Sequence, residues 1–200
     1  PPRIEEPVTE IGKTLFYPAY HGRNDRDLQR LMASAVSRCA PSVNFVAPHT
    51  QQPRARLPQQ KIRVAFISQY FHHHSVGLHY GQLIRALPRE RLQVSVVRFG
   101  PPPDVTAREI SAAADESLEV RPILTEAQRA IAARQFDVIC YTDLGMDPLT
   151  YYLAFARFAR VQCVLPGHPV TTGLSTIDYF ISSRLMEFRG ADEHYTEKLV

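Results

Sequence analysis

Cysteine is scarce in this sequence of 200 residues, and its spacing argues against a cysteine-based metal site. The three cysteines, Cys39, Cys140 and Cys163, form no CxxC pair and no other spacing typical of metal ligands. Cys140 and Cys163 lie inside apolar runs, where buried free thiols are usual. The pattern therefore indicates a reducing compartment.

Long apolar runs, a signal peptide and a strong charge of one sign are also missing. No run of 18 apolar residues occurs, which predicts a soluble, cytoplasmic protein with no membrane partner. The net charge is only +3, and the arginines are spread along the chain. We therefore expect no nucleic-acid partner.

Several motifs that would indicate a particular cofactor or reaction are absent. No GxGxxG or Walker loop follows the first predicted strand, which argues against a dinucleotide site and a P-loop. No HExxH motif and no serine or cysteine nucleophile motif is present.

What the chain does contain is a regular alternation of apolar strands and amphipathic helices. Such alternation is typical of βαβ units on a parallel sheet. It predicts an α/β, Rossmann-like sheet with helices on both faces. Strands are expected at 61–68, 92–99, 117–123, 137–142, 161–165 and 177–182, and helices at 76–87, 105–114, 126–134 and 148–158.

The first 60 residues have a different sequence pattern. A helical pattern follows Asn24 and Asp25, either of which can cap it. Residues 41–60 are rich in Pro and Gln and lack periodicity, which favours a linker wrapped onto a neighbour. We therefore expect a helical lead-in and linker at 1–60 and a Rossmann-like domain at 61–200.

Three polar clusters directly follow predicted strands. They read "SQYFHHHS", "DLGMDP" and "PGHPVTTG". Because the carboxyl ends of parallel strands share one edge, the clusters should converge there, where open α/β sheets bind ligands. A cleft at this edge is the expected site.

The first cluster contains His72, His73 and His74. In an extended segment His72 and His74 would share a face, but a metal site would need further ligands that the pattern does not supply. We therefore expect no metal. His72 and His73 fit surface or packing roles best, whereas His74, nearest the helix start, fits a general base or a group that holds a hydroxyl or phosphate.

The other clusters allow two interpretations each. Gly167 would let the backbone approach a ligand, with His168, Thr171 and Thr172 as donors and acceptors. Equally, this could be a tight turn whose threonines satisfy backbone groups. Asp143 and Asp147 flank Gly145, and Asp147 can be a helix cap before Pro148.

Longer stretches carry a family resemblance. The segments "RVAFISQYFHHHSVG", "GHPVTTGLSTIDYFISS" and "HYTEKLV" together resemble the catalytic region of the O-GlcNAc transferase family. The preceding "FYPAYHGRNDRDLQRLMASAVSRCAP" resembles the helical segment that leads into that region in bacterial relatives. The likeness is to its bacterial SPINDLY-like and tetratricopeptide-repeat members and to the related bacterial N-glycosyltransferases. It implies the amino-terminal half of a GT-B fold.

The resemblance also implies an activity. The family moves a sugar, GlcNAc or hexose, from a UDP-sugar to a Ser, Thr or Asn side chain of a protein, without a metal or other cofactor. His74 matches a cleft histidine proposed as a base in the family. The motif GxPxTxG is matched by Gly167, Pro169, Thr171 and Gly173, and His168 fits its bacterial form. Asp137 stands where animal members carry a second histidine.

The family's UDP site lies mainly in a second Rossmann-like domain, which these 200 residues do not include. The resemblance therefore implies a part of a UDP-sugar-dependent protein glycosyltransferase that is inactive alone, with a protein acceptor as partner. The alternative is a non-catalytic, degenerate transferase domain that acts as a binding or scaffold module.

Overall fold

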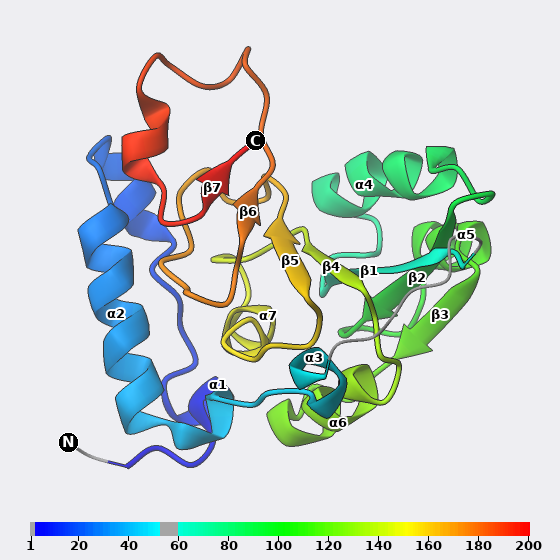
Figure 1. The fold of residues 1–200 in the computed structure, drawn as a ribbon, viewed down its shortest axis with the longest axis horizontal. Helices are drawn as coiled ribbons and strands as arrows, with labels where there is room; N and C mark the ends of the chain where they lie inside the picture. The colour runs from blue at the N-terminus through cyan, green and yellow to red at the C-terminus, as the bar shows by residue number, and fades with distance from the viewer. Residues whose placement is uncertain (1–2, 53–59) are drawn as a thin grey trace.

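The computed structural model describes residues 3–52 and 60–200, and a parallel sheet forms its centre (Figure 1). Seven strands occur in the order β3-β2-β1-β4-β5-β6-β7, and all neighbours run parallel. The strands are β1 (Ile62–Ser68), β2 (Leu92–Arg98), β3 (Glu116–Glu119), β4 (Val138–Tyr141), β5 (Val161–Val164), β6 (Tyr179–Phe180) and β7 (Lys198–Leu199).

The central strand β1 shows why this sheet needs helices on both faces. Its side chains alternate between two apolar cores: Val64 and Phe66 join one, and Ala65 and Ile67 join the other. A strand buried on both sides reads as a continuous apolar run, as the sequence does here. The Rossmann-like prediction with helices on both faces is confirmed.

The helices divide between the two cores. One face is covered by α4 (Ser75–Ala86) and α5 (Val105–Ala113), which contribute Ile84 and Ile110. The other is covered by α6 (Leu124–Ala132) and α7 (Pro148–Leu153), joined by α2 (Arg26–Cys39). In Figure 1, α2 stands along the side of the sheet where β7 lies, and α4 and α5 lie at the opposite side.

The amino-terminal segment is more structured than expected. Besides α2 it contains α1 (Pro7–Glu10), η1 (Tyr17–His21), η2 (Pro41–Val43) and α3 (Pro48–Gln51). The predicted linker 41–60 thus includes two short helices, and its residues 53–59 lie outside the described part of the chain. Its docking onto a neighbour is visible, since Arg157 N–H donates to Phe45 O at 2.9 Å and Ala47 N–H donates to Arg157 O at 2.9 Å.

Those contacts also explain one wrong boundary. The helix expected at 148–158 ends at Leu153 because the chain must turn to bring Arg157 beside Phe45 and Val46. Other boundaries also differ, among them the end of β3, which lies at Glu119 and not at residue 123. The helix α6 begins before Thr125, which is therefore not its cap, and β6 is only two residues long. The strand β7 falls in the "HYTEKLV" segment, where no strand was expected.

Candidate functional site at the carboxyl edge of the sheet

The loops that follow β1, β4 and β5 meet at one edge of the sheet. Gln69 N–H, after β1, donates to Asp143 Oδ2, after β4, at 3.1 Å. Gly167, after β5, lies so close to the β4 loop that a Cβ there would overlap the carbonyl oxygen of Thr142. The predicted convergence is therefore present. The edge includes the point between β1 and β4 where the strand order reverses, the usual ligand site of such sheets.

The β1 loop is tightly folded against the start of α4. His72 N–H donates to Tyr70 O at 2.8 Å, and His74 N–H donates to His72 O at 2.7 Å. The Phe71 side chain is fully buried in the core beneath. A Cβ at Gly77 would overlap the His72 carbonyl oxygen, so only glycine lets the helix pass this close to the loop. The loop is held as a rigid platform for its histidines.

His74 is the residue that caps α4. Its Nδ1 accepts a hydrogen bond from Val76 N–H at 3.2 Å. The neutral ring therefore carries its proton on Nε2, which makes Nε2 a donor. Burial, and then the neighbouring His72, lowers the pKa of His74 below the ordinary value of 6.5. At neutral pH this side chain offers an N–H group.

The two other histidines separate as the alternation predicts. The His72 and His74 rings lie 5.8 Å apart, and both flank Tyr70, whose ring centroid is 4.4 Å from that of His74. His73 is exposed, and its backbone N–H donates to Asp104 Oδ2 at 2.7 Å.

Two buried carboxyl groups come from the β4 loop. Burial raises the pKa of Asp143 to about 8; the Gln69 N–H bond opposes this rise and the charge of Asp147 adds to it. Burial also raises the pKa of Asp147, which caps α7 by accepting Thr150 N–H at 3.0 Å. Both carboxyls raise the pKa of Tyr70, although burial contributes most. We call this group the switch-point cluster: Gln69, Tyr70, His72, His74, Asp143 and Asp147.

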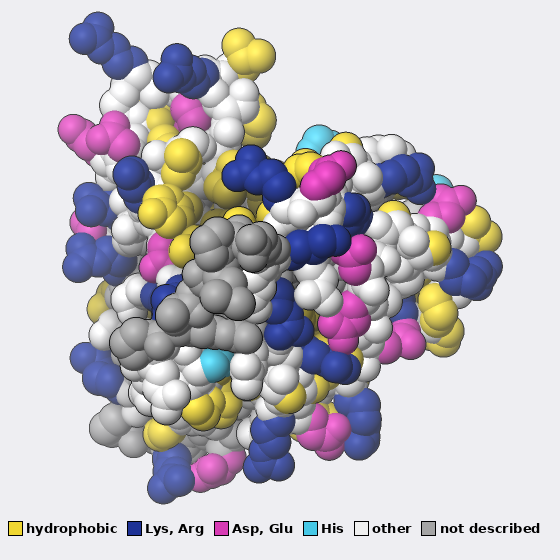
Figure 2. Space-filling view, turned by 45° about the vertical axis from the view of Figure 1, so that its right-hand side comes forward, with side chains coloured by type: hydrophobic (Ala, Val, Ile, Leu, Met, Phe, Trp, Pro, Cys, Tyr) yellow, Lys and Arg dark blue, Asp and Glu magenta, His cyan; other side chains and the backbone are white. Residues whose placement is uncertain are grey.

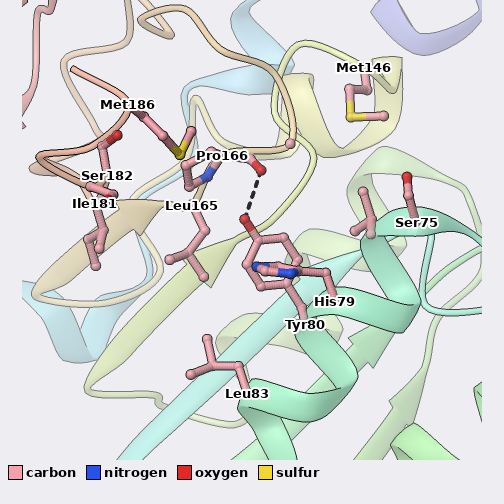
Figure 3. Close-up of a pocket in the computed structure, with 13 residues that line it drawn as sticks. Ser75, His79, Tyr80, Leu83, Met146, Leu165, Pro166, Ile181, Ser182 and Met186 are labelled. Carbon is pink, nitrogen blue, oxygen red and sulfur yellow. Dashed lines mark hydrogen bonds between the residues drawn. The ribbon is translucent and has the colours of Figure 1, made fainter. Parts of the chain in front are cut away.

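An apolar cavity of about 680 Å³ opens beside the cluster (Figure 3). The first turns of α4 supply Ser75, His79 and Tyr80, and the opposite wall carries Pro166 and Met186. Figure 3 shows the Tyr80 hydroxyl reaching across to the Pro166 carbonyl oxygen, to which it donates at 2.8 Å. This volume lies within the range of small-molecule binding pockets.

Of the site residues predicted in the turn after β5, only Gly167 lines this cavity. His168 is 3% exposed, and its ring stacks on Phe16 at 4.8 Å. Burial lowers the pKa of His168, against smaller raising effects of the Leu15 carbonyl and the Asp25 charge. Its place is between the amino-terminal segment and the sheet edge, behind the cavity wall.

The threonines of the turn have a partner that the sequence did not reveal. The Thr171 hydroxyl donates to Glu197 Oε2 at 2.6 Å, and Thr172 donates to Glu197 Oε1 through its backbone N–H, at 2.8 Å, and through its hydroxyl. All three side chains are buried. This network fastens the turn to the chain just before β7, which agrees with the interpretation as a tight turn.

The remaining predicted residues lie apart from the cavity. Gly173 packs so closely on α2 that a Cβ would overlap the backbone of Gln29. Pro169 is exposed and lines a separate hollow of about 310 Å³ with Arg23 and Phe188.

Asp137 is placed at the opposite edge, at the amino end of β4. Its Oδ2 accepts Arg63 N–H at 2.9 Å. It is thus a backbone-binding residue far along the strands from His74, and does not take the place of a cleft histidine.

Three further observations concern metal binding, membrane spans and surface charge. Within residues 3–52 and 60–200, no group of three or more His, Cys, Asp or Glu side chains could hold a metal, and no helix is long and apolar enough to cross a membrane. On the face shown in Figure 2, basic and acidic side chains are interspersed rather than gathered by sign.

Tyr70, Ser75, Met146 and Pro166 lie within the three polar clusters but were assigned no role from the sequence, and Asp104, Tyr80, Leu165 and Met186 lie outside these clusters. Tyr80, Leu165 and Met186 look like ordinary core or loop residues in sequence, because their apolar character says nothing about a hollow between them. The position of Asp104 in the sequence did indicate a helix cap, because an aspartate before a helical pattern is a typical cap.

Comparison with known proteins bears on the identity of the site. No protein-family model and no curated protein matches the chain. Among solved structures, a mutant of the O-GlcNAc transferase of Thermobaculum terrenum matches with a TM-score of 0.69 and 25% sequence identity. The match covers 86% of this chain and 33% of that one, so the chain spans about a third of the enzyme's length. The chain thus has an O-GlcNAc transferase-like α/β fold that matches half of a GT-B fold, which confirms the family resemblance of its sequence motifs.

Proposed function

We propose that this chain is part of a metal-independent glycosyltransferase that moves a sugar from a UDP-sugar to a Ser, Thr or Asn side chain of a cytoplasmic protein. The observation that carries the proposal is the position of His74 and the cavity. Both lie at the carboxyl edge, in a fold like that of an O-GlcNAc transferase.

In this proposal the chain supplies the acceptor side of the reaction. The apolar cavity between α4 and the β5 loop receives the acceptor side chain or a face of the sugar, and excludes water from it. In this proposal UDP is held mainly by a second domain, as the family resemblance implies. Transfer then needs both parts, because positioning of two substrates is lost when one site is missing.

His74 is best suited to orient a substrate. Its Nδ1 is occupied by Val76 N–H, so the exposed ring position is an N–H donor rather than a base. This N–H group can donate a hydrogen bond to a hydroxyl oxygen of the acceptor or to an oxygen of the UDP-sugar. The hydrogen bond becomes stronger as negative charge develops on that oxygen during transfer. No other cofactor is required in this scheme.

One observation favours the alternative of a non-catalytic binding module. The Thr171 and Thr172 side chains are hydrogen-bonded to Glu197, and the buried His168 ring is covered by Phe16, which leaves few polar groups of the turn within reach of a substrate. A degenerate domain would keep these contacts and lose transfer.

The test uses the longer natural protein that contains this chain. Thermal unfolding is followed with UDP, UDP-GlcNAc, UDP-glucose and, as a control, GDP-mannose. A UDP-sugar that binds should raise the melting temperature in a concentration-dependent way. Transfer of radiolabelled sugar to protein then separates the two candidates. Stabilisation by a UDP-sugar with transfer supports the enzyme, whereas an intact fold with neither effect supports the binding module.

A further inference from the structure

The loop that follows β2 also reaches the carboxyl edge, and no role follows for it from the proposed chemistry. It begins at Gly100, where a Cβ would approach the Gln69 carbonyl oxygen to 3.2 Å, and ends at Asp104. It is therefore in contact with the β1 loop that carries the histidines.

The two carboxylate oxygens of Asp104 accept hydrogen bonds from two different elements, α5 and the β1 loop. Its Oδ1 accepts Ala107 N–H at 2.7 Å and so caps α5. Its Oδ2 accepts His73 N–H at 2.7 Å. A helix cap needs only the first bond. The second bond joins the first turn of α5 to the middle of the histidine run.

The loop presents Asp104 from a stiff support. Pro101, Pro102 and Pro103 precede it, and each fixes its own backbone angle φ. Two arginines bind the carbonyl oxygens of this run: Arg98 donates to Pro101 O at 3.0 Å, and Arg108 donates to Pro103 O at 2.7 Å. The carboxylate is thus fixed before any ligand arrives.

The bond to His73 N–H acts on His74 through the backbone. His73 lies between His72, whose carbonyl oxygen accepts His74 N–H at 2.7 Å, and His74, whose Nδ1 accepts Val76 N–H. A rotation of the peptide that precedes His73 would break the His72–His74 bond and release the His74 ring from its cap.

We propose that Asp104 is a positioning residue for His74: by holding His73 N–H, it fixes the ring of His74 with Nδ1 on the α4 backbone and its proton on Nε2. The structural part of this inference is independent of the proposed function, and only its effect on turnover depends on that function.

The primary experiment is a histidine titration of this chain by NMR, which reads the ring state directly. Wild-type His74 should titrate below 6.5 and show the tautomer protonated on Nε2. The groups that face it are His72 and Tyr70, and Asp104 faces His72 and His73, so their titrations are followed in the same spectra.

Asp104→Asn is the variant that separates the two hydrogen bonds of Asp104. Its amide oxygen can still cap Ala107 N–H, but its NH₂ group cannot accept His73 N–H. The His74 pKa should move up toward 6.5 and its two tautomers should mix, while buried His168 keeps its signals. Asp104→Ser, which caps α5 but is too short to reach His73, should do the same. Asp115→Asn is the control, since Asp115 Oδ2 binds Val94 N–H at the start of the neighbouring strand.

In the longer protein, Asp104→Asn should lower kcat roughly tenfold with little change in KM for the sugar nucleotide, because an oriented donor loses effect when it moves. An unchanged His74 pKa and tautomer in both folded Asp104 variants would overturn the inference. Altered NMR signals with no transfer activity in the wild-type protein would leave the positioning role standing and refute the proposed function instead.

Discussion

The imidazole of His74 and the backbone N–H of Val76 are 3.2 Å apart, with Nδ1 as the acceptor. This single bond decides what the most prominent histidine of the sequence can do. A ring whose Nδ1 accepts a hydrogen bond, and whose pKa is lowered by burial, carries its proton on Nε2 at neutral pH, and His74 itself does not line the cavity. The general base expected from the sequence would need the ring to leave this cap.

The first prediction concerns the kcat of the longer protein. His74→Ala should reduce kcat about 10²–10³-fold, as for loss of a transition-state hydrogen-bond donor. His74→Gln places an amide N–H near the position of Nε2 and should retain activity within about tenfold of wild type, because it restores a donor and not a base. His73→Ala is the control and should be nearly silent. Equal loss of activity in the Ala and Gln variants would refute the donor role.

The second prediction concerns Gly77. Gly77→Ala should destabilise the chain by about 2–4 kcal/mol, because the new Cβ overlaps backbone of the β1 loop, which cannot move cheaply. Gly81→Ala on the same helix meets only the Ile110 side chain, at 3.0 Å, and should change stability by less than about 1 kcal/mol. Chemical denaturation measures both. Equal effects at the two glycines would contradict the tight contact at His72.

The third prediction concerns Asp143 and pH. Its folded pKa of about 8 lies above the ordinary 3.8, so the folded protein keeps a proton that the unfolded chain releases between these values. This contribution to stability is complete below 3.8 and is lost as pH rises to about 8. Asp143→Asn, which mimics the neutral group, should therefore gain roughly 2–4 kcal/mol over wild type at pH 8 and much less at pH 5.

Denaturant titrations of both proteins at the two pH values give the difference. Asp27→Asn is the matched control, since the Asp27 side chain is 96% exposed. It should change stability by no more than about 0.5 kcal/mol at either pH. A variant of Asp143 that shows the same pH dependence as wild type would mean that the carboxyl is ionised in the folded protein.

The fourth prediction concerns the Thr171–Thr172–Glu197 network. Glu197→Ala should cost about 2–4 kcal/mol, because buried hydroxyl and N–H donors lose their acceptor. Glu109→Ala, on the exposed face of α5, should cost less than about 0.5 kcal/mol. Thermal and denaturant unfolding provide the measurement. If the Glu197 variant lost sugar-nucleotide affinity but kept its stability, the turn would instead be part of the binding site.

The sheet was predictable because its evidence is local and repeated. Val64, Phe66 and their neighbours form an apolar run that only a strand buried on both faces explains, and the same pattern recurs along the chain. Element ends were harder, since they depend on distant partners. The end of α7, for example, is set by the docking of Arg157 on Phe45.

The site was predictable only in outline. The convergence of the polar clusters at one edge was predictable, because strand direction brings their loops together. The roles within them were not visible, since they depend on three-dimensional neighbours: Glu197 binds the threonines of the turn, and Phe16 covers His168. Apolar Met186 and Leu165 gave no sign of a cavity, because a hollow is a property of packing and not of composition.

The packing of residues 13–16 on the sheet edge matters for how a minimal fragment should be cut. The Tyr152 hydroxyl donates to Lys13 O at 2.9 Å, Thr14 donates to the Gly145 carbonyl oxygen, and Phe16 stacks on His168. An expression fragment that began at residue 61, where the sheet starts, would uncover the apolar face of His168 and leave these acceptors and donors without partners. Such a fragment should aggregate or expose its β4 and β5 loops to protease, whereas a fragment that keeps residues 3–52 retains the wall behind the cleft. The segment before the sheet is therefore a structural part of the carboxyl edge, and gene truncations intended to isolate that edge should begin upstream of Lys13.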